Sequence, residues 1–467
     1  MSILYSLDQF WNDLSTVLTN RNQTYTFTDF FSLNIGKYNP QRIAQLQLSL
    51  QQFDSKKLSK LIQNNPTIKS IEWPAFELFI LKYLLFVRDI DPWSILKSID
   101  LFISVLECQS MLLNTKNNNK YDKISKLFLE NFKESMDLVI QLSHLIDTKS
   151  MEIHNREMDF PRLTYVSTIL LKSLNNIRST ADLNTAENYD KIQLLFDISS
   201  NLCDVYYKIG SPVLCSNVFS NVNILNLNRR LIKKSKLLRF RFIMGKYYAH
   251  QSNFISSFHH LNECFKSLCL SKCPSSAITT ILKYLIPVGL IQGKIANIQL
   301  IRSHISNTNH SLNKILDIYE PILKIFKQGN LYGFYSLIYQ HENFWKSIRL
   351  WIPILQKTRV LLLRNLLLKT WKLQNGTLSW AMIRLSLLNA LQGMDTLPIT
   401  YQFTSNLNND NVDEYVRNLV ADVVFSGYIK LKFNGQNLVL GKTDTFPDMH
   451  TTLTARFAGN PKEAWLD

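Results

Sequence analysis

Residues 237–265 read LLRFRFIMGKYYAHQSNFISSFHHLNECF, and their spacing decides the fold. Gly245 and the aromatic Tyr248 lie three residues apart, and the small Ser257 follows nine residues later. A glycine has no side chain to hold a second helix away, and a small residue suits the place where that helix crosses it. The stretch therefore predicts a pair of helices that cross closely.

The spacing resembles the tetratricopeptide pattern, in which Leu261 and Cys264 continue the second helix. Helical periodicity extends to both sides of it and breaks at polar loops such as NTKNNNKYDK (114–123). The further helices are expected at residues 74–88, 93–113, 123–147, 159–178, 187–209, 276–293 and 317–347. Stacked pairs of this kind form a right-handed superhelix with extended faces for partners.

Composition supports an all-α chain. Glycine and proline number 13 each among 467 residues, about half of average usage or less. Both residues break helices, so their scarcity favours long helical runs. One proline has a predicted place, because Pro92 suits the first turn of the helix after residue 91, with Asp91 as its cap.

The C-terminal part changes character. Helical segments are expected at about 358–374, 378–391 and 411–426, the last capped by Asn411 with Glu414 three residues on. The next stretch, YIKLKFNGQNLVLGK (428–442), alternates apolar and polar residues around Asn434-Gly435, which is a strong hairpin signal. Three helices followed by a hairpin form the winged-helix arrangement. Phe446 and Trp465 are candidates to dock the remaining tail.

These patterns predict four parts in an all-α, TPR-like helical-repeat superhelix that runs into a C-terminal winged helix with a small β-hairpin. They are an N-terminal helical region (1–195), TPR-like repeats (196–350), a winged helix (351–441) and a tail (442–467).

The net charge of +16 is concentrated in the middle of the chain. Residues 1–204 hold 21 Lys/Arg against 23 Asp/Glu, a net charge of −2. Residues 205–394 hold 25 against 4, a net of +21, and residues 395–467 hold 6 against 9, a net of −3. In a region this poor in acids, the cations have few carboxylates nearby in the sequence with which to form ion pairs. The region therefore creates a positive potential that attracts polyanions. Nucleic acid and an acidic protein segment both fit this potential.

The densest basic stretch has seven cations in 13 residues. They are Arg229, Arg230, Lys233, Lys234, Lys236, Arg239 and Arg241. On one continuous helix, positions 230, 233, 234, 237 and 241 would share a face. Like charges this close destabilise a helix, so we expect a counter-charge from nucleic acid or from an acidic protein, the alternative being a solvated face.

A second basic set lies in the predicted winged helix. Its members are Lys369, Lys372, Arg384, Arg417, Lys430, Lys432 and Lys442. The third helix of sequence-reading winged helices enters the major groove. Here that helix carries Asp413, Glu414 and Asp422 against Arg417, which argues against base readout. Phosphate contacts without sequence preference fit better, and a subunit-pairing surface is the alternative.

The sequence gives no support for catalysis, a metal or a cofactor. It contains no GxxxxGK[ST], GxGxxG, HExxH or GxSxG motif. His259, His260 and the cysteines at 264, 269 and 273 fit no standard zinc spacing, so we expect buried helical cysteines there. The cysteine pattern suits a reducing cytosol or nucleus. The N-terminus has no basic leader, and the longest apolar stretch (73–87) is too short to span a bilayer, so no membrane insertion is expected.

Helical repeats that continue into a winged helix resemble the PCI domain, found in subunits of the proteasome lid, the signalosome and a translation initiation factor. The resemblance is carried by IYEPILKIFKQGNLYGFYSLIYQHENFWKSI (318–348), with Tyr319, Phe326, Gly329-Asn330 and Phe334 at the positions of the helix-turn-helix that precedes the winged helix.

Four stretches resemble one branch of this family, the PCI subunit of the fungal nuclear-pore-associated second transcription-export (TREX) complex, which exports messenger RNA. They are RDIDPWS (88–94), SPVLCSNVF (211–219), GKYYAHQSNFISSF (245–258) and ILKYLIPVGLIQGK (281–294). The resemblance implies a nuclear, pore-associated scaffold that pairs with a large scaffold subunit. It also implies a small acidic disordered subunit over the helical domain, and a winged-helix platform for RNA and DNA.

Two other readings remain open. A sister branch, the PCI subunit associated with the fungal signalosome, shares the later motifs and implies a protein that only binds proteins. An autonomous DNA-binding regulator is a third reading, against which the acidic third helix argues.

Overall fold

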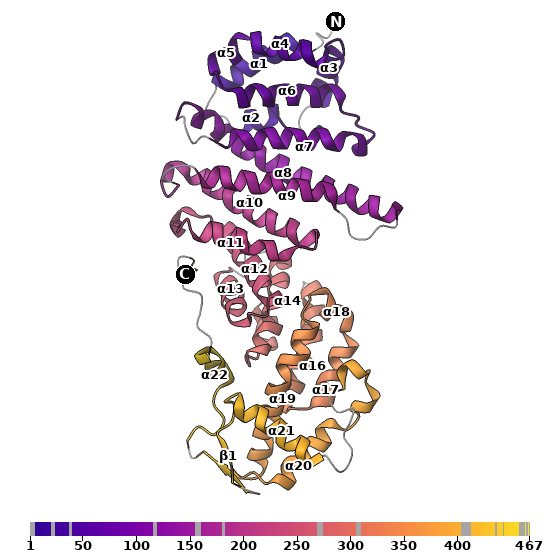
Figure 1. Ribbon diagram of the computed structural model, residues 1–467, viewed down its shortest axis with the longest axis vertical. Coiled ribbons are helices and arrows are strands. Elements are labelled where there is room, and N and C mark those ends of the chain that lie inside the picture. Colours follow the sequence, from indigo (N-terminus) through magenta and orange to yellow (C-terminus); the bar gives the residue numbers. More distant parts are fainter. Residues whose placement is uncertain are drawn as a thin grey trace. The chain divides into compact units, whose positions relative to one another are not determined.

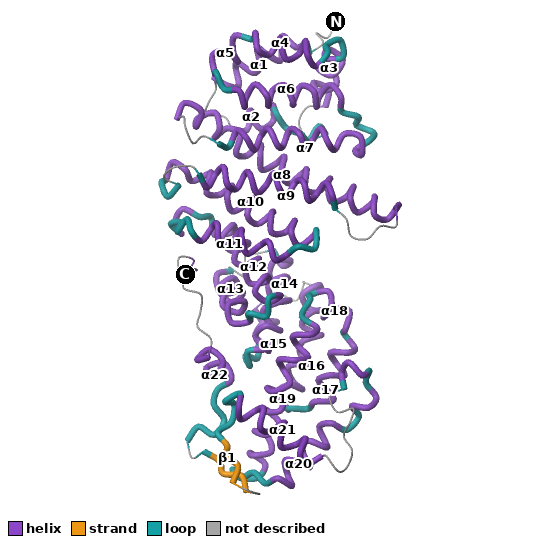
Figure 2. Tube along the Cα trace, in the orientation of Figure 1, coloured by secondary structure: helices purple, strands orange, loops and turns teal. Residues whose placement is uncertain are grey.

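The structure is a computed structural model in which nearly all regular structure is helical (Figure 2). The described residues are 5–19, 24–36, 40–114, 119–154, 160–179, 183–268, 274–304, 310–402, 412–434, 437–441, 443–456, 463 and 466. The chain forms two compact units, Met1–Phe240 with Lys462–Asp467, and Arg241–Pro461. The bounds of the four predicted domains stay predictions. In the described part of the chain, no helix is long and apolar enough to cross a membrane.

The first unit is built from helices that stack in successive layers (Figure 1). They are α1 (Leu7–Thr19), α2 (Thr24–Phe30), α3 (Pro40–Leu50), α4 (Ser55–Asn64), α5 (Pro66–Ile71), α6 (Pro74–Asp89), α7 (Ile95–Leu112), α8 (Asn119–His154), α9 (Pro161–Arg178), η1 (Ala186–Asn188), α10 (Tyr189–Lys208), η2 (Pro212–Leu214), α11 (Cys215–Asn223) and η3 (Arg229–Leu231). Consecutive layers pack directly, α6 on α7, α7 on α8 and α9, and α9 on α10. This is the predicted helix–loop–helix rhythm.

An aromatic cluster forms the core of the N-terminal layers. Phe31, the residue after α2, packs edge to face on Phe79 and Tyr83 of α6, with ring centroids 5.0 and 5.1 Å apart. Phe128 of α8 also contacts Phe79, with ring centroids 4.9 Å apart. The buried Tyr83 hydroxyl donates to the carbonyl of Phe30 at 3.0 Å, which satisfies the one polar atom of the cluster.

The second unit holds the remaining helices and the two strands. They are α12 (Lys234–His250, whose first residues belong to the first unit), α13 (Phe254–Ser267), α14 (Ser275–Ile291), α15 (Ile298–His304), α16 (His310–Gln328), α17 (Leu331–Gln340), α18 (Glu342–Ser347), α19 (Trp351–Leu373), α20 (Trp380–Leu391), η4 (Met394–Thr396), η5 (Ile399–Tyr401), α21 (Val412–Phe425), β1 (Leu431–Asn434), β2 (Asn437–Leu440) and α22 (Met449–Arg456).

The close helix crossing predicted from residues 237–265 is confirmed. The Ser257 hydroxyl of α13 donates to the Gly245 carbonyl of α12 at 2.7 Å. A Cβ at position 245 would lie 2.7 Å from Cγ of Leu261, closer than real Cβ contacts. The glycine and the serine therefore allow the two backbones to meet, as the tetratricopeptide-like spacing required.

The three C-terminal helices and the hairpin are also confirmed. Helix α19 packs against α20 and α21, and β1 pairs antiparallel with β2 from Leu431↔Leu440 to Asn434↔Asn437. Gly329 follows α16 with φ +69°, and a Cβ there would lie 2.4 Å from the backbone nitrogen of Leu366 in α19. The glycine therefore allows the end of α16 to pack closely against α19. The predicted Asn411 cap and Trp465 contact lie outside the described residues.

The prediction for Pro92 is wrong by one turn. Helix α7 begins at Ile95, after Ser94 as the N-cap. Pro92 instead lies in the turn before the helix, where the Asp91 carboxylate accepts from the backbone N–H of Trp93 at 3.0 Å. An aspartate that bonds two residues ahead closes a turn as readily as it caps a helix, and the sequence does not separate the two.

Candidate partner and nucleic-acid interface

The basic segment 229–241 is not one helix, which corrects the prediction of a shared helical face. Arg229 and Arg230 lie in η3, where the Asn228 side chain accepts from the N–H of Arg230. Helix α12 begins only at Lys234. The break separates the first cations from the helix, so the seven cations are distributed over two elements.

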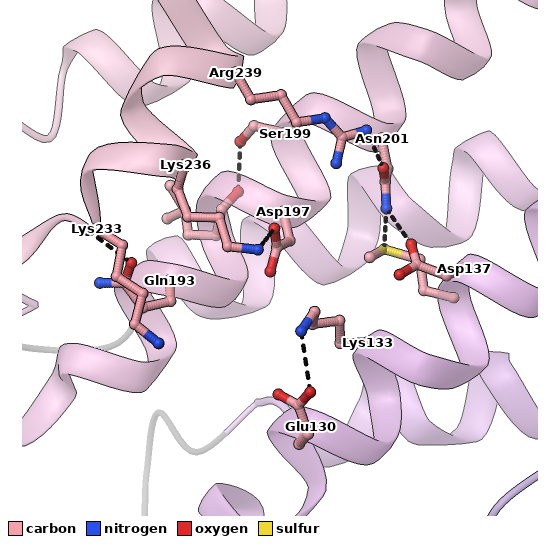
Figure 3. A network of polar contacts seen from close by, with 12 residues as sticks. Glu130, Lys133, Asp137, Gln193, Asp197, Ser199, Asn201, Lys233, Lys236 and Arg239 are labelled. Atoms are coloured by element: carbon pink, nitrogen blue, oxygen red, sulfur yellow. Dashed lines mark hydrogen bonds and ion pairs between the residues drawn. The ribbon is translucent and has the colours of Figure 1, made fainter. Parts of the chain in front are cut away.

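Carboxylates of α10 neutralise part of this segment (Figure 3). Lys236 forms an ion pair with Asp197, whose side chain is almost wholly buried. Arg239 donates to Asp204 at 2.8 Å and to Asn201 at 2.6 Å. The counter-charge expected from a partner is therefore supplied in part by this chain. Asp197 and Asp204 precede the cations they pair with by 39 and 35 residues, so a count of charges within the segment misses them.

Neutral contacts attach the start of the segment to the same helix. The Gln193 amide donates to the carbonyl of Leu231 at 2.7 Å and accepts from the N–H of Lys233 at 3.0 Å (Figure 3). One glutamine thus satisfies two backbone groups at the break between η3 and α12. This contact fixes where the exposed cations project.

The network continues into α8. The Asn201 amide donates to Asp137 at 2.7 Å, and Lys133 pairs with Glu130 at 3.0 Å (Figure 3). Burial acts to lower the pKa of Lys133, but the hydrogen bond and charge of Glu130, with Asp197 and Asp137 nearby, raise it overall. A lysine with a raised pKa stays charged, so the acids around it keep a local cation.

Between α2, α8, α10 and the start of α12 lies a groove of about 650 Å³. Its ionisable lining comprises Asp29, Lys126, Glu130, Lys133, Glu134, Asp137, Asp190, Asp197, Lys233 and Lys236. Acids outnumber lysines in this groove, although it borders the densest basic segment of the sequence.

Four cations of the segment remain exposed at its N-terminal end. They are Arg229, Arg230, Lys233 and Lys234. Lys233 also lies over the ring of Tyr189, with its Nζ 5.7 Å from the centroid. In contrast, Arg241 is only 2 % exposed. The surface available to a partner is therefore the η3–α12 junction rather than the whole segment.

The winged-helix cations are exposed and weakly paired. Lys369 and Lys372 lie at the end of α19, and Lys432 lies on β1. Arg384 is 3.4 Å from Asp413, with both side chains exposed. Exposed pairs of this length contribute little stability, so these cations keep their charge for other ligands.

Two further members of this set have defined neighbours. Arg417 lies over the ring of Trp380 at 5.6 Å, between α21 and α20. Lys430 is 3.6 Å from Asp444, in an exposed pair. Lys442 lies outside the described residues. The predicted acids of the third helix lie on α21, where Asp413 and Glu414 are exposed in the first turn.

The segment 443–447 brings the wing and α19 together. Asp444 pairs with Lys430 of the wing, and the Phe446 ring packs against Trp371 of α19 at 5.5 Å. The buried Arg364 donates to the carbonyls of Phe446 and Pro447 at 3.3 and 3.1 Å. Burial lowers the pKa of this guanidinium. Phe446 therefore docks the tail as predicted, and the buried Arg364 of α19 supports it.

His260 and Cys264 of α13 are packed in the interior, whereas His259 is exposed. His260 is buried and stacks on Tyr248, with ring centroids 5.7 Å apart. Burial raises the pKa of the Cys264 thiol to about 12, which keeps it protonated. Within the described residues no group of three or more His, Cys, Asp or Glu could hold a metal. Cys269 and Cys273 lie outside them.

Comparison with known proteins links this architecture to a set of fungal proteins, although no family profile matches the chain. The nuclear mRNA export protein THP1 of Saccharomyces cerevisiae is 28 % identical over 357 residues, which cover 74 % of this chain and 75 % of THP1. A PCI domain-containing protein of Schizosaccharomyces pombe is 24 % identical over 51 % of this chain and 53 % of its own length. The chain is similar to PCI-domain proteins, as its sequence predicted.

A third relative represents the sister branch. A CSN12 homolog of Schizosaccharomyces pombe is 23 % identical over 275 residues, 58 % of this chain and 58 % of that protein. Among PCI-like features, the helix-turn-helix signature corresponds to α16, α17 and α18, and the winged helix to α19–β2. The two basic groups thus lie on different parts of a PCI-like chain, one ahead of the α12–α13 crossing and one in the winged helix.

Proposed function

We propose that the chain is a non-enzymatic PCI scaffold subunit of a nuclear, pore-associated complex that couples transcription to messenger-RNA export. The observation that carries the proposal is the similarity to nuclear mRNA export protein THP1 along three quarters of both chains. The fold agrees with this role, since stacked helices offer extended faces and the winged helix offers a separate module.

The exposed cations at the η3–α12 junction suit the small acidic, disordered subunit of such a complex. Arg229, Arg230, Lys233 and Lys234 are exposed, whereas Lys236 is held in an ion pair with Asp197 of α10. A disordered acidic chain can follow a short irregular junction of this kind and gain charge-assisted hydrogen bonds from its arginines.

The winged-helix cations suit phosphates. Lys369, Lys372 and Lys432 are exposed, whereas the exposed acids at the start of α21 disfavour insertion of that helix into a major groove. We therefore expect these lysines to contact the phosphate backbone of RNA or DNA without sequence preference. A large scaffold subunit that pairs beside this module would complete the nucleic-acid surface.

Co-purification tests the proposal. The chain, expressed with an affinity tag at its natural level, should recover a large scaffold subunit and a small acidic subunit of the export complex, together with pore proteins. Loss of the chain should retain polyadenylated RNA in the nucleus. Recovery of signalosome subunits with normal RNA distribution would contradict the proposal.

A set of charge reversals tests the junction. Arg229→Glu with Arg230→Glu and Lys233→Glu should release the acidic subunit and spare RNA binding by the purified complex. Lys236 is left intact because its ion pair with Asp197 holds α12 on α10. The matched set in the winged helix is Lys369→Glu with Lys372→Glu and Lys432→Glu. It should weaken RNA binding and leave the acidic subunit bound. Equal loss of both ligands in both sets would contradict the division of roles.

The signalosome-associated subunit is the second candidate. It is favoured by the similarity to the CSN12 homolog, which covers a smaller share of the chain at lower identity. That role needs protein contacts only, so intact function after reversal of the winged-helix cations would favour it.

A further inference from the structure

An exposed tryptophan lies at the turn between α6 and α7. Trp93 is 96 % exposed, and the next apolar side chains, Ile95 and Leu96, are 43 % and 58 % exposed. Large apolar side chains that project together into solvent mark interaction sites, and tryptophan dominates the energetics of protein interfaces. None of the contacts assigned above uses this turn.

The turn is held rigidly from both sides. The Asp91 carboxylate accepts from the N–H of Trp93 at 3.0 Å, and the Ser98 hydroxyl accepts from the N–H of Asp91 at 3.0 Å. Gln47 of α3 donates to the carbonyl of Ile90 at 2.9 Å. A side chain presented by an ordered backbone loses less entropy on binding, so the tryptophan is preorganised for a partner.

A groove of about 500 Å³ lies between α7 and α9. Its walls are Asp100, Ile103, Ser104 and Glu107 of α7, and Pro161, Arg162 and Tyr165 of α9. More of the wall is apolar than polar. Leu96, Asp100, Ile103 and Glu107 follow helical spacing, so they lie along one face of α7. The exposed Leu96 therefore lies on the face of α7 that lines the groove, and Trp93 precedes it by three residues.

The charges of this surface favour a cation. Glu107 accepts from the Tyr165 hydroxyl at 3.0 Å and lies 3.5 Å from Lys172, and Arg162 pairs with the buried Asp147. Asp100 is exposed and forms no ion pair with any described residue. The unengaged charge in the groove is thus a carboxylate, which repels phosphate and attracts lysine or arginine.

We propose that the α7–α9 groove binds an amphipathic helix of a protein partner. The helix presents large apolar side chains to Trp93, Leu96 and the groove, and a lysine or arginine to Asp100. Helices that lay an apolar face into a groove are a recurring mode of recognition. The proposal goes beyond the export function, because it stands on the first unit and uses neither basic group.

A peptide selection tests this proposal on the full chain. The probe is a phage-displayed library of helices about 16 residues long, randomised on one face. Selected peptides should carry leucine-like residues three and four apart and a flanking lysine or arginine. In anisotropy titrations, Trp93→Ala should weaken the selected peptide by at least about tenfold and Asp100→Lys by about fivefold.

Two features keep the test decisive. Leu300→Ala on α15 removes an apolar side chain about as exposed as Leu96, 55 % against 58 %, and should leave the affinity unchanged. Trp93→Ala removes few contacts, so the far-ultraviolet circular dichroism and melting temperature of the chain should not change. Selected peptides that are acidic, or that bind Trp93→Ala as well as the unaltered chain, overturn the proposal.

Two other occupants are separate outcomes. If Trp93→Ala weakens single-stranded RNA rather than the peptide, the tryptophan stacks on bases and the proposal is wrong. If the unaltered chain sediments as a dimer that Trp93→Ala dissociates, a second copy occupies the groove, and the proposal is again wrong.

Discussion

In the basic segment 229–241, Lys236 and Arg239 face carboxylates of α10, one of them buried, and four further cations are exposed at the η3–α12 junction. In the winged helix the corresponding pairs, Arg384 with Asp413 and Lys430 with Asp444, are long and exposed. The densest cations in the sequence are thus the more neutralised in space. Density of charge along a chain therefore does not measure charge available to a ligand.

The largest expected effect is on the buried pair. Asp197→Ala leaves the partly buried ammonium of Lys236 without its carboxylate and should destabilise the first unit by about 3 kcal/mol. Urea denaturation followed by circular dichroism measures this loss. Asp204→Ala, seven residues on, removes an exposed pair and should cost about 0.5 kcal/mol. Equal effects would remove the contrast between buried and exposed pairs.

The next effect concerns the buried cation of the winged helix. Arg364→Met deletes two hydrogen bonds to the carbonyls of Phe446 and Pro447, at a cost of about 2 kcal/mol. Amide hydrogen exchange should accelerate in residues 443–456, while exchange in α7 stays unchanged. Arg364→Lys keeps the charge but not the forked geometry and should be intermediate. Unaltered exchange in the segment would show that Phe446 alone docks it.

A smaller effect concerns RNA. Lys369→Glu with Lys372→Glu and Lys432→Glu should lower the RNA affinity of the reconstituted complex by about tenfold, or 1.4 kcal/mol. The plot of log affinity against log salt should become shallower by about 2, because three phosphate contacts are lost. Arg229→Glu with Arg230→Glu and Lys233→Glu is the matched control. A larger loss in the control would place the nucleic acid at the η3–α12 junction instead.

The smallest expected effect is a pH dependence of the first unit. Burial acts to raise the pKa of Asp122, but hydrogen bonds from Lys191 and Lys126 outweigh it and lower the pKa. A carboxyl group whose pKa is lower in the folded than in the unfolded state stabilises the fold. This stabilisation is fully present above the unfolded-state pKa, near pH 4, and is lost as the pH falls through the folded-state pKa. Asp122→Asn should flatten the acid limb of stability, measured by urea titration. An unchanged limb would assign it to other carboxylates.

Much of the fold could be predicted because it depends on local rules. Helical periodicity located helices such as α6, α7, α9 and α10 to within a few residues, the Gly245–Ser257 spacing located a helix crossing, and alternation around Asn434-Gly435 located the hairpin. The break at Ile232 and Lys233 was missed, because Gln193 of another helix stabilises it. The place of Pro92 was missed because capping and turn signals share the same residues.

The sequence by itself determined the all-α class, the repeats that end in a winged helix, the resemblance to PCI-domain proteins and the region that holds the excess of cations. These follow from periodicity, propensity and composition, which are properties of neighbours along the chain. Only the tertiary structure decided which cations pair with carboxylates of α10, that Arg364 is buried under the tail, that Trp93 is exposed, and that a groove lies between α7 and α9. Ion pairing and burial depend on distances in space, and those distances join residues that the sequence separates by 30 to more than 80 positions.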